Sequence, residues 1–151
     1  MATLDEVRKE LDKDELDYPE LAHEYGAAML PQLKALVAED EPRIAPKAAY
    51  LAGVISEAAS HEVVALAARS RHDVVRVAAA AAAAKLPTQQ GVSVTTELLN
   101  DTDAGVRIRA MKSAATIDDP ALAARVKVMS EQDRDADVRG LAGSTYQRMR
   151  Q

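Results

Sequence analysis

Three arginines recur at a regular spacing and are the first candidates for ligand chemistry. Arg76, Arg107 and Arg139 each directly follow a valine. A guanidinium is a rigid fork of donors that fits a phosphate or a carboxylate, so a row of three could bind an acidic ligand. An aspartate also lies two to four residues before each arginine, and its carboxylate could occupy the same fork. Two interpretations therefore stand side by side, a ligand-binding row and a set of internal ion pairs.

Histidine offers metal chemistry at two places in the chain. His23-Glu24 and His61-Glu62 each join two residue types that bind metal ions. The two pairs lie 38 residues apart, a spacing that does not match the sequence repeat of 31 or 32 residues. Because ligands must converge within about 2 Å of a single ion, we predict that these pairs form no metal site.

Other reactive groups are missing from the sequence. The chain has no cysteine, which excludes disulfides, thiolate metal sites and cysteine nucleophiles. It has no glycine-rich phosphate loop, no Gly-x-Ser-x-Gly elbow and no zincin motif. We therefore expect no catalytic residue, no cofactor and no enzymatic activity.

The arginines owe their spacing to a repeat that runs through most of the chain. The aligned apolar positions are Ile44, Val75, Val106 and Val138. The positions four residues later are Ala48, Ala79, Ala110 and Ala142. A period of this length is typical of solenoids, in which each unit buries its apolar face against its neighbours. Abundant alanine and an aromatic content of 3% favour helices over strands.

Turn and capping signals divide the chain into a cap and a repeat region. We expect residues 1–27 to form an acidic helical cap, in which Pro19 lies in the first turn of a helix. Residues 28–151 are expected to form the repeats, in one domain with the cap. Within them, Ser60 is predicted to cap a helix and residues 88–91 to form a loop.

The charge distribution limits the kinds of partner. The net charge is −5, and residues 1–45 carry 12 acidic and 5 basic side chains. Nucleic-acid binding requires a basic footprint, so we predict no nucleic-acid partner. The polar, acidic start is not a secretory signal, and no apolar stretch reaches the roughly 20 residues that span a bilayer. We therefore expect no membrane partner and a cytoplasmic location.

The pattern Asp-x-(x)-Val-Arg-x-x-Ala resembles the short HEAT-repeat family of bacterial proteins, including those of the bilin-lyase type. The resemblance covers about residues 28–150, although the first unit has Ile44-Ala45 in place of Val-Arg. It implies that each arginine bridges to a turn aspartate of its own or a neighbouring unit. We expect an all-α fold, a right-handed α-solenoid of about four HEAT-like helix pairs with an N-terminal helical cap.

The second helix of each pair is predicted to present an inner face of low charge. At about 100° per residue, the second, fifth, sixth and ninth positions after the aligned residue point away from the first helix. Of these sixteen positions only Lys112 is charged, although the chain as a whole is 28% charged. Close packing of neighbouring second helices is one explanation, since small residues permit it.

The other explanation is a shallow apolar groove that binds a partner. In that case the predicted partner-binding residues are Tyr50, Val77, Ile108 and Met111 as anchors, Lys112 within the face, and Lys47, Arg109 and Arg148 as a basic rim. Such a groove would favour a protein segment or peptide, in particular an acidic amphipathic helix. It could also close a homodimer or hold the chain's own acidic N-terminal helix.

The predicted function is a non-enzymatic scaffold or adaptor that binds a helix or peptide on its concave face. The alternative, implied by the resemblance, is a ligand-handling enzyme or accessory factor of the bilin-lyase-like class.

Overall fold

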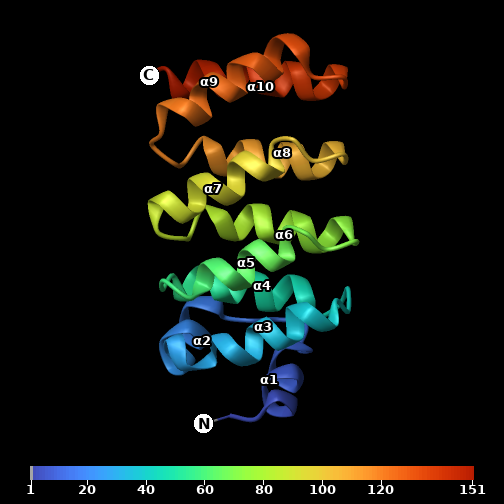
Figure 1. Cartoon of the computed structure of the whole chain (residues 1–151), viewed down its shortest axis with the longest axis vertical. Helices are drawn as coiled ribbons and strands as arrows, with labels where there is room; N and C mark the ends of the chain where they lie inside the picture. Colours follow the sequence, from blue (N-terminus) through green and yellow to red (C-terminus); the bar gives the residue numbers. More distant parts are fainter. Residues whose placement is uncertain (1) are drawn as a thin grey trace.

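The computed structural model describes residues 2–151, and most of this range is helical (Figure 1). The described residues contain α-helices, one short 3₁₀ helix, η1 (Gly26–Met29), and no strand. The α-helices are α1 (Leu4–Leu11), α2 (Tyr18–Tyr25), α3 (Leu30–Glu39), α4 (Ala45–Ile55), α5 (Ser60–Ala67), α6 (Asp73–Ala83), α7 (Thr88–Leu98), α8 (Ala104–Ala114), α9 (Pro120–Gln132) and α10 (Ala136–Met149). None of these helices is both long and apolar enough to cross a bilayer.

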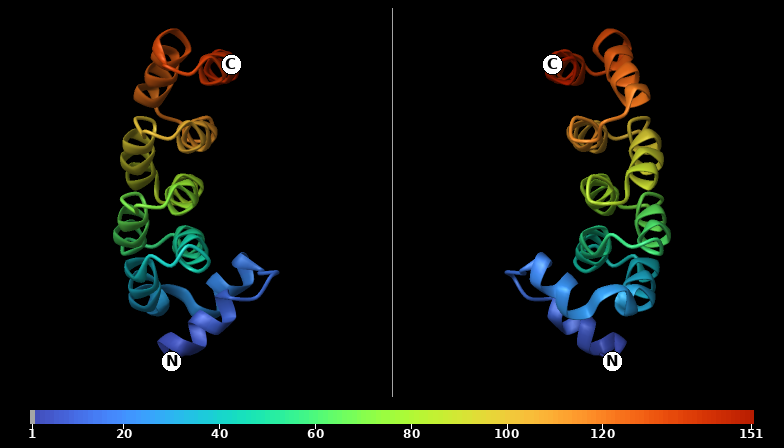
Figure 2. Two further views of the ribbon diagram at one scale, coloured as in Figure 1. Left: turned by 90° about the vertical axis from the view of Figure 1, so that its right-hand side faces the viewer. Right: turned by 90° about the vertical axis from the view of Figure 1, so that its left-hand side faces the viewer.

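From α3 onward the described helices form four pairs stacked in a row, which we call units 1 to 4 (Figure 1). The first helices of the units form one layer and the second helices form the other, and the row curves toward the second helices (Figure 2). Each second helix contacts the first helix of its own unit and the second helix of the next. The predicted all-α solenoid of four helix pairs is confirmed.

Capping side chains set where the helices begin. The carboxylates of Asp17, Asp103, Asp119 and Asp135 each accept a hydrogen bond from a backbone N–H in the first turn of the helix that follows. These bonds satisfy donors that have no partner inside the helix. Proline occupies the first turn of α2, α3, α4 and α9, where its missing N–H costs nothing.

The repeated apolar positions form the core between the two layers. The aligned positions and the alanines four residues later are all buried: Ile44, Val75, Val106, Val138, Ala48, Ala79, Ala110 and Ala142. Small side chains let neighbouring second helices approach closely. A Cβ added to Gly53 on α4 would lie 2.8 Å from both the Cβ and the carbonyl oxygen of Ala82 on α6. The close-packing explanation therefore holds at this contact.

Two predicted boundaries were wrong. Residues 88–91 form the first turn of α7, which begins directly after Pro87, and not a loop. Gly91 is buried there, and an added Cβ would lie 2.5 Å from the carbonyl oxygen of Ala83, so this glycine permits packing rather than a turn. Ser60 lies inside α5 rather than at its N-cap, and its buried hydroxyl accepts a hydrogen bond from the backbone N–H of Glu57.

The segment before unit 1 folds back along the solenoid. Helix α1 packs against α3, whereas α2 packs against α4 on the side of the second helices (Figure 2). The ammonium group of Lys47 donates to the carbonyl oxygens of Leu11 and Lys13, at 2.9 and 3.0 Å. Arg43 also donates to the Asp12 carboxylate. Lys47 on α4 and Arg43 just before α4 thus hold the acidic cap against unit 1.

A basic strip on the concave face

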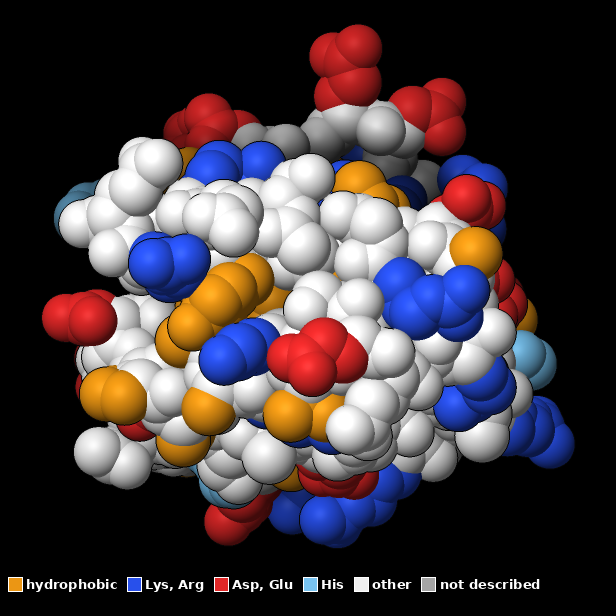
Figure 3. All heavy atoms as spheres, turned by 90° about the horizontal axis from the view of Figure 1, so that it is seen from above, with side chains coloured by type: hydrophobic (Ala, Val, Ile, Leu, Met, Phe, Trp, Pro, Cys, Tyr) orange, Lys and Arg blue, Asp and Glu red, His pale blue; other side chains and the backbone are white. Residues whose placement is uncertain are grey.

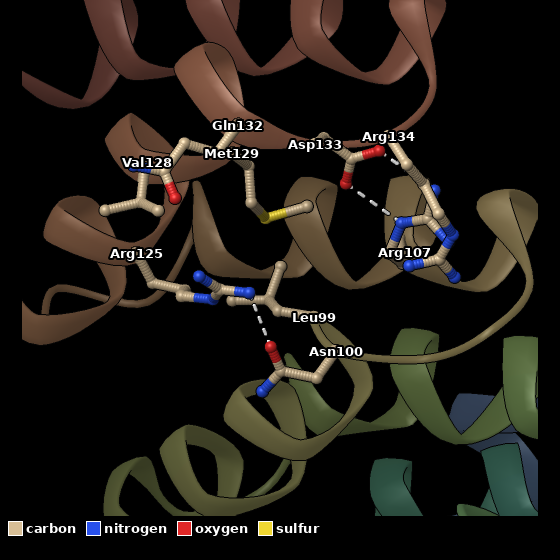
Figure 4. A pocket seen from close by; sticks show the side chains of 9 residues that line it. All are labelled: Leu99, Asn100, Arg107, Arg125, Val128, Met129, Gln132, Asp133 and Arg134. Carbon is tan, nitrogen blue, oxygen red and sulfur yellow. Dashed lines mark hydrogen bonds and ion pairs between the residues drawn. The ribbon is translucent and has the colours of Figure 1, made fainter.

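The forks of two repeat arginines are occupied by aspartates of the following unit. Arg76 Nε and Nη2 lie 2.9 and 3.2 Å from the carboxylate oxygens of Asp101. Arg107 Nε and Nη2 lie 3.0 and 2.9 Å from those of Asp133, and both side chains are buried. Figure 4 shows the Arg107 fork directed at Asp133. The prediction of pairing with a neighbouring unit is confirmed for both arginines, which excludes them from a ligand-binding row.

The aspartates that pair differ from those expected from the spacing. Asp103, which precedes Arg107 by four residues, caps α8 instead. The pairing aspartates lie five residues before the aligned valine of the next unit, where they also accept backbone N–H bonds. Burial would raise the pKa of the Asp133 carboxyl, but hydrogen bonds from Arg107 and from the backbone N–H of Asp135 hold that pKa below its ordinary value.

A hollow of about 220 Å³ adjoins the Arg107–Asp133 pair between units 3 and 4. Arg125 lies on its other side and donates to the side-chain oxygen of Asn100 at 2.5 Å (Figure 4). Arg134 donates to the carbonyl oxygens of Asp101 and Thr102. The guanidinium groups around this hollow are therefore bound within the solenoid.

Of the two kinds of contact that Arg76 and Arg107 make, to a carboxylate and to a carbonyl oxygen, Arg139 makes only the second. Its Nη1 donates to the carbonyl oxygen of Asp133 at 2.7 Å, just as Arg76 donates to Ser70 and Arg107 to Asp101. No carboxylate among the described residues faces its fork, because unit 4 is the last unit that the structure describes.

The open face of the second helices is turned relative to the predicted one. Met111, a predicted anchor, is only 1% exposed, and Ala49 and Ala80 at the same repeat position are also buried. This fifth position faces the next second helix: Ser113 Oγ of α8 donates to the carbonyl oxygen of Ala80 at 2.6 Å. The prediction that Met111 contacts a partner was wrong, because the second helices pack against one another as well as against the first layer.

The positions that remain open are the second, third, sixth and tenth after the aligned residue. At about 100° per residue these four cover one continuous arc of each helix. All sixteen are half-buried or exposed, and we call them the concave strip: Pro46, Lys47, Tyr50, Val54, Val77, Ala78, Ala81, Lys85, Ile108, Arg109, Lys112, Thr116, Gly140, Leu141, Ser144 and Arg148. The strip contains Tyr50, Val77 and Ile108 of the predicted anchors.

The concave strip is basic, in contrast to the nearly uncharged face that was predicted. It carries five basic side chains and no acidic one, in a chain whose net charge is −5. Lys47 donates to carbonyl oxygens of the cap, and its predicted role in a partner-binding rim stays a prediction. The other four basic residues form no ion pair with any described residue: Lys85, Arg109, Lys112 and Arg148.

Two of these four cations donate only weak bonds to neighbours on their own helix. Arg109 Nη1 lies 3.5 Å from Ser113 Oγ, and Arg148 Nη2 lies 3.5 Å from Thr145 Oγ1. Sequence reasoning missed Lys85, which occupies the same repeat position as Arg148. Its position in the repeat was a signal that could have found it.

At the cap end the strip deepens into a hollow of about 500 Å³, which we call the aromatic hollow. The rings of Tyr18 on α2 and Tyr50 on α4 meet edge to face, with centroids 4.9 Å apart. Burial, followed by the proximity of Tyr50, raises the pKa of Tyr18. The remaining lining residues are Leu16, Asp17, Pro19, Val54 and Lys85.

The histidines lie in the cap and in unit 2. His23 lies in the last turn of α2, His61 in the first turn of α5, and His72 at the N-cap of α6. Among the described residues, no three histidine, aspartate or glutamate side chains are grouped so that they could hold a metal ion.

Comparison with known protein families gives one match. A family model of HEAT repeats matches residues 60–146, which is more than half of the chain. No curated protein matches the chain. The match does not reach the level of a subfamily, so the likeness to bacterial bilin-lyase-type repeats stays a prediction.

Proposed function

Because the chain belongs to the HEAT-repeat proteins, we propose that it is a cytoplasmic, non-enzymatic scaffold or adaptor that binds an acidic segment of another protein on its concave strip. HEAT repeats commonly mediate protein–protein contacts. Stacked units with a continuous open face provide the extended concave surface that such binding uses.

The observation that carries the proposal is the set of four cations without carboxylates on the strip. Elsewhere on the molecule some exposed basic residues, such as Lys34, pair with nearby acids, and others, such as Lys9 and Lys127, form no ion pair with a described residue, but these are not gathered on one acid-free face. Lys85, Arg109, Lys112 and Arg148 have no such acid among the described residues, and no acidic side chain interrupts them. A row of unpaired cations attracts a negatively charged partner and raises its association rate.

The chain's own cap supports an acidic helix as the occupant. Residues 12–24 carry six acidic side chains and one lysine, and α2 within this segment lies against α4. Tyr18 of this segment rests on Tyr50, and Lys47 binds the backbone at its start. The cap therefore provides an example of an acidic helical segment that lies against a second helix, next to the open strip of units 2 to 4.

Binding is tested with a synthetic acidic amphipathic helical peptide, using fluorescence anisotropy at low ionic strength. We expect the Lys112→Glu and Arg109→Glu double variant to bind the peptide about tenfold or more weakly, since it reverses charge at the centre of the strip. The Lys9→Glu and Lys127→Glu double variant reverses two charges away from the strip, on α1 and α9, and should leave affinity nearly unchanged. Equal losses in both variants would contradict the proposal.

A duplex DNA probe distinguishes proteins from nucleic acids as partners. The proposal expects weak DNA binding, because five basic residues in a chain of net charge −5 provide a small basic footprint. DNA binding that matches peptide binding and falls in the same double variant would overturn the assignment of a protein partner.

A further inference from the structure

The aromatic hollow differs in chemistry from the rest of the strip. Two tyrosine rings, Leu16, Pro19 and Val54 give it apolar walls, and they come from both the cap and unit 1. Asp17 at its edge is occupied as the N-cap of α2, where it accepts from the backbone N–H of Glu20 at 3.0 Å. Lys85 is the charged lining residue that no described residue pairs with.

The hollow is large enough for a bulky side chain. Its volume of about 500 Å³ lies within the range of small-ligand sites, which are lined by apolar and aromatic groups with a few polar ones. Tyr18 and Tyr50 are only half-buried, so parts of their rings face the hollow. Apolar walls next to an unpaired cation fit an apolar side chain that has a carboxylate nearby in its own chain.

We infer that the aromatic hollow is the anchor subsite of the concave strip and takes one bulky apolar side chain of the acidic segment. This inference rests on the proposed function, because the same segment then continues along units 2 to 4. The cations beyond the hollow are Arg109 and Lys112 on unit 3 and Arg148 on unit 4.

The stacking of the units sets the spacing of the partner's side chains. Packed helices lie about 8–10 Å apart, so successive cations along the strip are separated by about this distance per unit. A helix lying along the strip rises about 1.5 Å per residue, so residues seven apart share one face and advance about 10.5 Å. Counted from the hollow at unit 1, the partner therefore carries an apolar anchor near one end and carboxylates about two and three heptads beyond it.

The probes are three synthetic helical peptides of one length and net charge. The first has a leucine anchor near one end with glutamates at heptad spacing, the second has alanine in place of the leucine, and the third has the leucine moved to the middle. We expect the first peptide to bind about tenfold more tightly than the other two, because a buried leucine contributes more than one tenfold step in affinity.

The matching protein variant fills the hollow without a change in charge. Val54→Trp should remove the preference for the first peptide while the affinity for the alanine peptide stays as in the wild type. Val128→Trp makes the same substitution at an exposed position of α9, in the first layer and away from the strip, and should keep the preference. Val54→Phe, with circular dichroism and melting to check the fold, provides a second way to fill the hollow.

The outcomes separate this inference from the proposed function. If all three peptides bind the wild type equally, or if the preference survives Val54→Trp, the anchor subsite is wrong although the acidic strip stands. If no peptide binds, or if binding ignores Lys112→Glu, both fail.

Discussion

At the scale of single residues, three arginines with the same sequence context differ in what faces their forks. Arg107 is 3% exposed and pairs with Asp133, which is 6% exposed, whereas the Arg139 fork meets no carboxylate of a described residue. Both arginines keep the same bond to a carbonyl oxygen at the turn of their own unit. They form a comparable pair that differs in the ion pair and in one further bond, from Arg107 Nη1 to the carbonyl oxygen of Thr102 at 3.2 Å.

Arg107→Ala should lower the free energy of unfolding by about 3 kcal/mol, because it leaves the Asp133 carboxylate buried without its partner. Arg139→Ala should cost about 1 kcal/mol, the value of an ordinary hydrogen bond. Urea denaturation followed by circular dichroism measures both. Equal losses would show that the inter-unit pair adds nothing to the carbonyl bond.

The lowered pKa of Asp133 predicts a pH dependence with a definite sign. A carboxyl whose pKa is lower in the folded state stabilises the fold above its unfolded pKa of about 4, and this contribution is lost as the pH falls through the folded value. The advantage of the wild type over Asp133→Asn should therefore be constant from pH 7 to pH 5 and shrink below about pH 4.

Stability measured against pH, with Asp118→Asn in an exposed turn as the control, tests this dependence. An advantage that shrinks already above pH 5 would point to a different titrating group.

The sequence predicted that the repeat arginines form ion pairs, but it did not identify their partners. The arginine and aspartate types predicted an ion pair, but Asp101 and Asp133 could not be chosen over the nearer Asp103 and Asp135. That choice depends on how far one unit lies from the next, which the sequence does not state. The hydrogen-bond partners of Lys47 could not be identified from the sequence for a similar reason, because they are backbone carbonyls that carry no sequence signal.

At the scale of helices, the close contact between α4 and α6 depends on Gly53. An alanine there gains helix propensity of about 1 kcal/mol, but its Cβ meets the Ala82 backbone, and such overpacking costs about 1–3 kcal/mol. We expect Gly53→Ala to be destabilising overall, since a backbone atom cannot rotate away.

Gly140→Ala is the control, because an added Cβ has nothing within 4 Å of it on α10. It should stabilise the protein by about 0.5–1 kcal/mol. Thermal melting of both variants decides the point, and a Gly53→Ala variant as stable as Gly140→Ala would show that the helices can separate at little cost.

The helices themselves were largely predictable, and their open face was not. The repeat predicted the four helix pairs, and Pro19 placed the first turn of α2. The inner face was predicted from its angle to the first helix alone. In the structure each second helix has two neighbours, so the exposed arc is turned toward the third and tenth positions, where Lys85 and Arg148 lie.

At the scale of the whole molecule, the repeat determines the order of the units, but the position of the cap lies outside the repeat. No periodic signal relates residues 1–27 to unit 1, so the packing of α2 on α4 and the aromatic hollow between them required the structure. Seen along the solenoid from its C-terminal end, hydrophobic side chains are interspersed with Lys and Arg side chains (Figure 3). This view of the end of the solenoid shows no broad apolar face.

The arginine–aspartate pairs between units have a consequence for how repeats can be added to such a chain in evolution. Unit 3 contains both halves of the connector, Asp101 to receive the preceding arginine and Arg107 to reach the following turn. If the coding segment of unit 3 were duplicated in tandem, each new junction between units would therefore have an arginine on one side and an aspartate on the other. Where Ala45 replaces the arginine, the next turn has Ser70 in place of the aspartate, so loss of one half accompanies loss of the other.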